Sequence, residues 1–204
     1  GRLDEDTANE LVQTALEEGQ RLDSFISNIL DMTRIESGEI IFDANWVDAY
    51  LPIKNVQKRL RLRLGERQLH ITGPQAPLEV KMDRMMTEQV LQNIIDNAVK
   101  YSPPDMQIDL HYGPTVDGGF EYVVRDHGEG IPDAMLTRVF DKYERLKQSD
   151  STVAGTGLGL AICKAIMEKQ GGHILARNHP QGGAEFVIRF PEARPLEQGE
   201  EVST

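Results

Sequence analysis

The chain has 204 residues, the length of one ordinary domain with an appendage or of two small domains. Hydrophobic residues make up 39% and charged residues 27%, which is typical of a folded soluble protein, and the net charge of −11 argues against non-specific nucleic-acid binding. The single cysteine, Cys163, excludes an internal disulfide framework and a zinc ribbon, and it suits a reducing compartment.

Residues 6–36 are predicted to form one long helix that ends at Gly38, because glycine commonly stops helices. With Gly19 included, the following apolar residues recur at steps of three and four: Ala8, Val12, Ala15, Leu22, Ile26 and Ile29. A seam of this length needs a partner helix, which favours one arm of a helical bundle or dimer. The alternative is a helix that packs on its own domain.

Shorter elements follow. Strands are expected over 39–43, 68–72, 78–81, 106–112, 120–125, 173–177 and 184–190. Helices are expected over 47–64, 83–101 and 157–170, with a short helix over 132–140. A mobile polar loop is expected over 141–154, and a disordered acidic tail over 192–204. The hairpin signals favour an α+β fold, a two-layer sandwich of a mixed β-sheet and three α-helices.

The expected helix over 83–101 carries a polar face. Asn93 and Asn97 lie four residues apart, so they share one side of the helix, and Lys100 and Tyr101 continue that side. An amide oxygen can bind Mg²⁺ and a lysine can bind phosphate, so the face suits a nucleotide. On this motif alone, a plain solvent-exposed face is the better reading.

A second motif follows the strand expected over 120–125. Asp126 at the strand end could accept a hydrogen bond from an exocyclic amine. Gly128 and Gly130 would let the backbone approach a planar ligand closely. An ordinary glycine turn is the alternative.

A third motif, Gly155-Thr156-Gly157-Leu158-Gly159-Leu160-Ala161, opens a helix. Backbone N–H groups at a helix N-terminus bind phosphate, and the glycines could act as hinges of a lid. The motif is not a P-loop, because no Lys-Ser/Thr follows, and a polar loop instead of a strand precedes it, which argues against a Rossmann turn. Together and in this order, the three motifs predict one nucleotide pocket.

Five segments, NIIDNAVKYS, DHGEGIP, VFDKYER, GTGLGLAICKAI and GGAEFVIRFP, resemble the conserved boxes and closing strands of the ATP-binding domain of sensor histidine kinases. The resemblance covers about residues 39–191 and implies the Bergerat ATP-binding fold of gyrase, Hsp90 and MutL. The segment ILDMTRIESG at 29–38 and the last strands are most similar to the potassium and osmotic sensors of the Kdp branch.

The resemblance implies ATP and Mg²⁺ as cofactors, with Asn97 as the metal ligand and Asn93 beside the metal and the phosphates. Lys100 and Arg145 would contact phosphate and complete the catalytic set with Asn93. The adenine would contact Tyr101, Asp126, Gly128, Gly130 and Ile131, and the lid would use Phe140, Lys142, Gly155, Thr156, Gly157, Leu158, Gly159 and Leu160. Lys142 is the weaker phosphate candidate.

The phosphoacceptor box of the family is missing. None of the five histidines, His70, His111, His127, His173 and His179, has its context. Residues 1–38 resemble the second helix of the dimerisation bundle, so the acceptor-bearing helix of the same kinase would be the partner, in a homodimer, with a response regulator downstream. This chain alone would not autophosphorylate.

The first motif also lacks a general base that could take a proton from an attacking water molecule. Water-activating relatives carry a glutamate one turn before the metal-binding asparagine, and Asn93 stands there instead. We therefore expect slow ATP hydrolysis and a protein-histidine kinase. A regulatory pseudokinase and a Bergerat-fold ATPase remain the alternatives.

No apolar run approaches the length of a membrane span, and the start of the chain lacks a signal peptide. The resemblance implies the cytoplasmic part of a bacterial membrane-bound sensor, so we expect a cytoplasmic location and no direct membrane contact by this chain.

Overall fold

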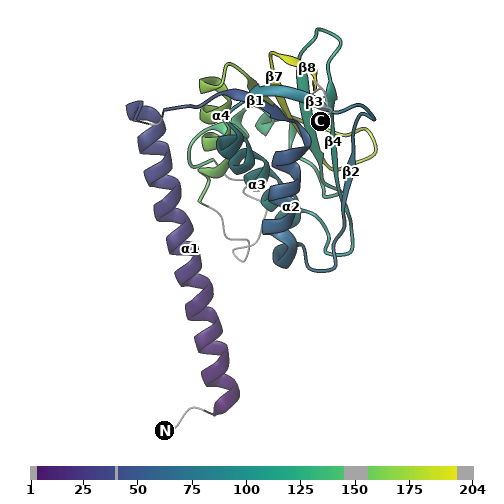
Figure 1. The fold of residues 1–204 in the computed structure, drawn as a ribbon. Coiled ribbons are helices and arrows are strands. Elements are labelled where there is room, and N and C mark those ends of the chain that lie inside the picture. Colours follow the sequence, from purple (N-terminus) through teal and green to yellow (C-terminus); the bar gives the residue numbers. More distant parts are fainter. Residues whose placement is uncertain (1–3, 40, 145–155, 197–204) are drawn as a thin grey trace, which may run out of the picture.

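The computed structural model describes residues 4–39, 41–144 and 156–196. Helix α1 (Glu5–Ser37) comes first and projects from a body of strands and shorter helices (Figure 1). The Asp4 side chain accepts a hydrogen bond from the Thr7 backbone N–H at 2.7 Å, and Gly38 ends the helix with a φ of 73°. Both are standard helix caps, and the helix predicted over 6–36 is confirmed.

The body holds a mixed five-stranded sheet in the order β2-β4-β5-β7-β6. Its strands are β2 (Leu69–Thr72), β4 (Ile108–Pro114), β5 (Phe120–Arg125), β6 (His173–Asn178) and β7 (Ala184–Phe190). β2 runs parallel to β4, and the other neighbours are antiparallel. The central position of β5 places its carboxyl end, and the loop that follows, between β4 and β7.

Three helices cover one face of this sheet: α2 (Tyr50–Leu64), α3 (Arg84–Tyr101) and α4 (Gly159–Lys169) (Figure 1). The largest fully buried side chains between the two layers include Ile53, Leu60, Leu91, Ile94, Ile95, Ile108, Leu110, Phe120, Tyr122 and Phe190. The buried Tyr122 hydroxyl donates a hydrogen bond to the Ala49 carbonyl at 2.7 Å, which satisfies this polar group within the core. The predicted α+β sandwich with three helices is confirmed.

A second sheet was not expected. It is antiparallel, in the order β1-β3-β8, from β1 (Asn45–Asp48), β3 (Leu78–Met82) and β8 (Ala193–Pro195). The strand predicted over 39–43 is wrong, because the described residues 39 and 41–43 form no strand. The tail predicted to be disordered over 192–204 is ordered at its start, where β8 pairs with β3, and residues 197–204 lie outside the described residues. β1 and β8 each form by pairing with β3, and a local sequence pattern does not reveal such a partner.

Smaller corrections concern element ends. The second helix starts at Tyr50 instead of Val47, because residues 45–48 belong to β1. The short helix predicted over 132–140 is two separate 3₁₀ turns, Asp133–Met135 and Arg138–Phe140. Most of the loop predicted over 141–154 lies outside the described residues.

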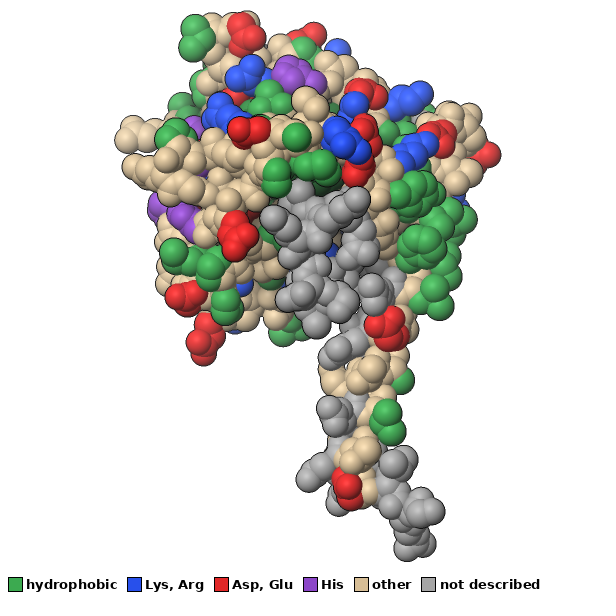
Figure 2. Space-filling view, turned by 180° about the vertical axis from the view of Figure 1, so that it is seen from behind, with side chains coloured by type: hydrophobic (Ala, Val, Ile, Leu, Met, Phe, Trp, Pro, Cys, Tyr) green, Lys and Arg blue, Asp and Glu red, His purple; other side chains and the backbone are tan. Residues whose placement is uncertain are grey.

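Near its C-terminal end, helix α1 packs on the body, where Ile35 is buried and Met32 contacts the core. Its other large apolar side chains, between 36% and 59% exposed, are Leu11, Val12, Leu16, Leu22, Phe25, Ile26, Ile29 and Leu30. Seen from behind, the far part of the helix stands clear of the body, with hydrophobic side chains on its surface (Figure 2). No helix among the described residues has the length and apolarity of a membrane span.

The contribution of β8 can be tested by truncation. A chain that ends at Pro191 should have a free energy of unfolding about 1–3 kcal/mol lower than one that ends at Leu196. It loses the pairing with β3, the bond from the Leu196 N–H to the Pro77 carbonyl at 3.0 Å, and Arg194, whose guanidinium lies 4.2 Å from the Trp46 ring centroid.

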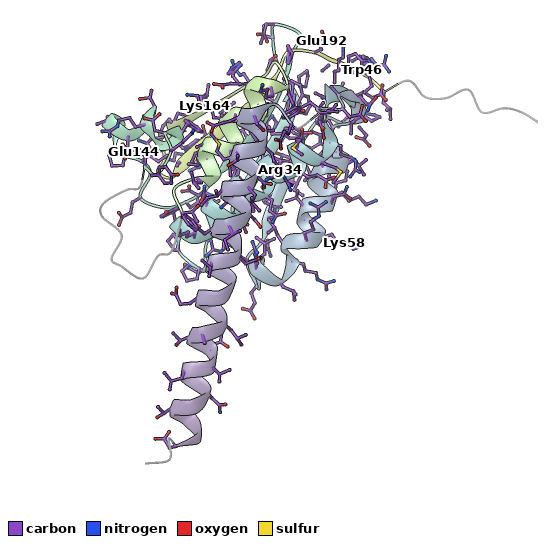
Figure 3. All side chains as sticks on the ribbon, turned by 90° about the vertical axis from the view of Figure 1, so that its left-hand side faces the viewer. Arg34, Trp46, Lys58, Glu144, Lys164 and Glu192 are labelled. Atoms are coloured by element: carbon purple, nitrogen blue, oxygen red, sulfur yellow. The ribbon has the colours of Figure 1, made fainter. Side chains whose placement is uncertain are left out.

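Urea titration followed by Trp46 fluorescence measures this difference, because Trp46 is the only tryptophan and lies at the same end of the molecule as Glu192 (Figure 3). The Trp46 emission of the shorter chain should also shift to the red. Equal stability and equal spectra for the two chains would show that β8 contributes nothing.

Candidate nucleotide-binding site

Helix α3 presents the predicted polar face to the side opposite its buried one. Asp83 caps the helix by accepting from the Met86 N–H at 3.1 Å, and Leu91, Ile94, Ile95 and Ala98 are buried. Asn93, Asn97 and Lys100 are only partly buried. The helix therefore holds these three side chains on one rigid face, as the spacing predicts.

Asp126 lies at the end of β5 and is only 5% exposed. Its Oδ1 accepts hydrogen bonds from the backbone N–H groups of Gly128 at 2.9 Å and Ala184 at 3.1 Å, and no described residue donates to Oδ2. Burial raises the pKa of the Asp126 carboxyl above its ordinary value, although the two backbone bonds oppose that shift. The two hydrogen bonds to Oδ1 thus fix the side chain, and Oδ2 can still accept a hydrogen bond from a ligand.

Gly128 brings the loop after β5 against the end of α3. A Cβ at this position would lie 2.3 Å from the Tyr101 carbonyl oxygen, so only glycine fits without moving backbone. Tyr101 itself is half-exposed, and the Lys100 Nζ lies 5.0 Å from its ring centroid. The structure therefore brings Asp126, Gly128 and Tyr101 together from β5 and α3.

The N-terminus of α4 lies beside the same face of α3. The Asn93 amide donates to the Gly159 carbonyl at 3.4 Å, and no side chain caps the helix at Leu158. Free N–H groups at a helix start can bind an anionic group. A Cβ on Gly159 would make only ordinary contact with Asn93, at 3.9 Å, so this glycine is not required by protein packing.

The residues before α4 form the base of the predicted lid. Gly157 has a φ of 70°, and a Cβ there would lie 2.9 Å from the Tyr143 Cα. The Tyr143 N–H donates to the Gly157 carbonyl at 2.9 Å, which ties the two sides of the predicted lid together. Phe140 is buried and stacks edge-on against Phe186, so it anchors one side. Leu158 is buried and Leu160 packs against the core.

Two predicted nucleotide-binding side chains contact α1 instead of the α3 face. Lys142 forms an ion pair with Glu36, and the Thr156 hydroxyl accepts from the Asn28 amide at 3.3 Å. The predicted residues Arg145 and Gly155 lie outside the described residues. The remaining predicted residues, Gly130 and Ile131, lie in the loop after Asp126, where Ile131 is buried.

The hairpin between β6 and β7 supports this loop, and although both strands are predicted, their contact with the loop is not. A Cβ on Gly183, whose φ is 85°, would lie 1.9 Å from the Asp126 carbonyl oxygen, and Ala184 bonds Asp126 on both its backbone and its side chain. The Gly-Gly pair after a turn was the available signal. Full burial raises the pKa of the Cys163 thiol to about 12, so this side chain stays protonated at neutral pH.

The profile of the family described as "Histidine kinase-, DNA gyrase B-, and HSP90-like ATPase" matches residues 82–194, which contain all three motifs. The chain belongs to this family. Within it, the chain is 35% identical to the sensor protein KdpD of Escherichia coli K12 over 82% of its length, and 34% identical to KdpD of Clostridium acetobutylicum over 93%. It therefore carries the ATP-binding domain that sensor histidine kinases contain, and the resemblance to the Kdp sensors is confirmed.

The chain spans only about a fifth of those relatives, 18% and 21% of their lengths. Among solved structures, the histidine kinase ThkA in complex with the response regulator protein TrrA matches with a TM-score of 0.74 and 21% identity. That match covers 94% of this chain and 53% of ThkA, and at this identity it supports the fold alone. Domains of this family bind ATP, so the predicted nucleotide class is confirmed at that level.

The steric role of Gly128 leads to a first test of the site. Gly128→Ala should weaken ATP binding at least about tenfold, because the added Cβ must push the loop away from Tyr101 and shift the Asp126 side chain. Gly113→Ala is the matched control, since the nearest atom to its Cβ would be 3.7 Å away. Titration with a fluorescent ATP analogue measures both variants. A Gly128→Ala variant that binds as tightly as the Gly113→Ala variant would contradict this placement.

The raised pKa of Asp126 leads to a second test. A carboxyl whose pKa is higher in the folded than in the unfolded chain destabilises the fold at neutral pH, and this penalty fades as the pH falls toward about 4, the ordinary aspartate value. Asp126→Asn keeps the Oδ1 acceptor and removes the charge. It should raise the free energy of unfolding at pH 7 and show a smaller gain near pH 4.

Asp117→Asn is the control for the sign of the effect. The Thr115 hydroxyl donates to the Asp117 carboxylate, and this bond is the main cause that lowers the pKa of Asp117. The wild-type aspartate there should stabilise the fold at pH 7 and lose that effect on acidification. Urea unfolding at the two pH values decides, and a less stable Asp126→Asn variant at pH 7 would refute the buried-charge account.

Proposed function

We propose that this chain binds Mg²⁺-ATP and supplies the catalytic part of a protein-histidine kinase, which transfers the γ-phosphoryl group to a histidine on another helix. The observation that carries the proposal is the buried Asp126, held through one oxygen beside a glycine that touches the end of α3. A base with an exocyclic amine fits this arrangement, because the Asp126 Oδ2 accepts no hydrogen bond from the described residues and can accept one from the amine.

The phosphates would lie between the polar face of α3 and the N-terminus of α4. Asn93 already contacts the first turn of α4, which supports a shared site. Lys100 supplies positive charge on the same face, and the uncapped N–H groups of α4 supply donors. Arg145, Gly155 and Lys142 belong to this proposal through the family resemblance, with Lys142 needing to leave Glu36 first.

The donor set on α3 fits Mg²⁺. The described residues contain no group of three His, Cys, Asp or Glu side chains that could bind a metal. Mg²⁺ in nucleotide sites is typically held by one or two protein oxygens, phosphate oxygens and water, so the Asn97 amide oxygen suffices. When bound, the ion would neutralise phosphate charge.

The chemistry requires positioning more than acid–base catalysis. A lone pair of an imidazole nitrogen attacks the γ-phosphorus, the N–P bond forms, the bond to the bridging oxygen breaks, and ADP leaves. Attack by water would need a base to take a proton, and Asn93 cannot accept one. This argues for a kinase and against a fast ATPase, with Asn93, Lys100 and Arg145 orienting the phosphates.

Helix α1 fits the role of the second helix of a dimerisation bundle. Its exposed apolar stripe needs cover, and the acceptor-bearing helix of the same kinase, in a homodimer, would provide it. The ThkA structure contains a response regulator, and we propose that a response regulator receives the phosphoryl group here as well. We place residues 1–38 in this bundle and the nucleotide-binding domain from 39, in the cytoplasmic part of a sensor.

A phosphotransfer experiment tests the proposal. The chain is mixed with a second polypeptide that carries the acceptor helix of a Kdp-type sensor, with γ-labelled ATP and Mg²⁺. Acid-labile, base-stable label should appear on the acceptor, whereas Asp126→Asn and Asn97→Ala should each reduce the labelling at least about tenfold. Gly113→Ala should label normally. ATP binding without any labelled histidine would favour a regulatory module, and rapid steady-state hydrolysis by the chain alone would refute the kinase assignment.

A further inference from the structure

The hairpin between β6 and β7 grips the loop after Asp126 at two points. The first is Asp126 itself. Its N–H donates to the Ala184 carbonyl at 3.0 Å, its side chain accepts from the Ala184 N–H at 3.1 Å, and Gly183 packs against its carbonyl. This end of the loop is therefore fixed by both backbone and side-chain contacts with β7.

The second point is Ile131, which is only 7% exposed. The Asn178 Oδ1 accepts from the Ile131 N–H at 2.8 Å, and the Asn178 Nδ2 donates to the Ile131 carbonyl at 2.7 Å. One side chain thus satisfies both backbone groups of a largely buried residue. The approach is close, since a Cβ on Gly130, whose φ is 82°, would lie 2.7 Å from the Asn178 Oδ1.

Only residues 127–130 lie between the two points, so the distance between them sets the conformation of the short loop. That loop contains Gly128, whose N–H orients the Asp126 carboxylate at 2.9 Å. If Asn178 releases Ile131, the buried backbone groups lose their partners and the loop must rearrange to find others. The rearrangement would move Gly128 and with it the carboxylate.

We propose that Asn178 is a positioning residue of the adenine subsite, which acts through Ile131 and Gly128 on Asp126 and touches no ligand itself. The inference rests on the proposed function of this site. It predicts that Asn178 controls recognition of the base. Recognition of the phosphates should be unchanged, because the protein groups that would bind them lie on α3 and at the start of α4. A side chain that merely stabilised the hairpin would change both equally.

The amide is required because the contact needs one donor and one acceptor. An aspartate in place of Asn178 would keep the size and the acceptor but could not donate to the Ile131 carbonyl, so Asn178→Asp is the sharp variant. Gln181→Ala is the matched control, since Gln181 is exposed on the same hairpin and only its backbone N–H forms a hydrogen bond within the described part of the chain. Asp126→Asn serves as the reference for a lost base contact.

Isothermal titration tests the proposal. The two probes are ATP and inorganic tripolyphosphate, each titrated in the presence of Mg²⁺. Asn178→Asp should bind ATP about ten- to a hundredfold more weakly, as expected for one or two buried hydrogen bonds, and should bind tripolyphosphate within about twofold of the wild type. Gln181→Ala should match the wild type with both probes. Equal weakening for both probes would overturn the proposal in favour of a general structural role.

A second variant covers the case in which Asn178→Asp does not fold. Asn178→Ser retains a shorter group that can make one of the two bonds, and it should show a smaller loss that is again confined to ATP. Unchanged ATP affinity in the variant that folds, with the expected loss in Asp126→Asn, overturns the role of Asn178 alone. Failure of the wild-type chain to bind ATP overturns the proposed function and this inference together.

Discussion

The candidate site depends on one buried carboxylate and the two backbone N–H groups that hold it. Asp126 lies at the end of the central strand of the five-stranded sheet, and its Oδ1 is bonded by its own loop and by the neighbouring strand β7. Burial of a charge is unfavourable unless hydrogen bonds compensate it, and here the compensation uses only one oxygen. The other oxygen remains an acceptor in a low-dielectric position, where a hydrogen bond to a ligand is strong.

The fold supplies this carboxylate with fixed neighbours. Helix α3 packs against β4 and β5, so Tyr101 at its end meets Gly128 of the loop. A second buried carboxylate secures the other end of α3: Glu88 is fully buried and accepts from Asn55 and Arg84 while pairing with Arg59. The polar face of α3 is therefore held by packing along the helix and by ion pairs near its start.

The sequence predicts much of this site because several of its signals are local. The caps of α3, the i, i+4 asparagines and the glycines around Asp126 all act within a few residues, and their patterns predict a nucleotide pocket. The features that the sequence does not predict depend on contacts between residues far apart in the chain. β1 and β8 form only by pairing with β3, Asn178 reaches Ile131 across 47 positions, and Lys142 reaches Glu36 across 106. No local propensity encodes such contacts.

The central claim is that Asp126 recognises the exocyclic amine of the base. A chemical double-mutant cycle tests it directly: the affinities of wild type and Asp126→Asn are measured for ATP and for the purine riboside triphosphate that lacks the 6-amine. We expect the wild type to prefer ATP by about tenfold or more and the variant to have lost this preference. Equal affinity of the wild-type chain for the two nucleotides would contradict it.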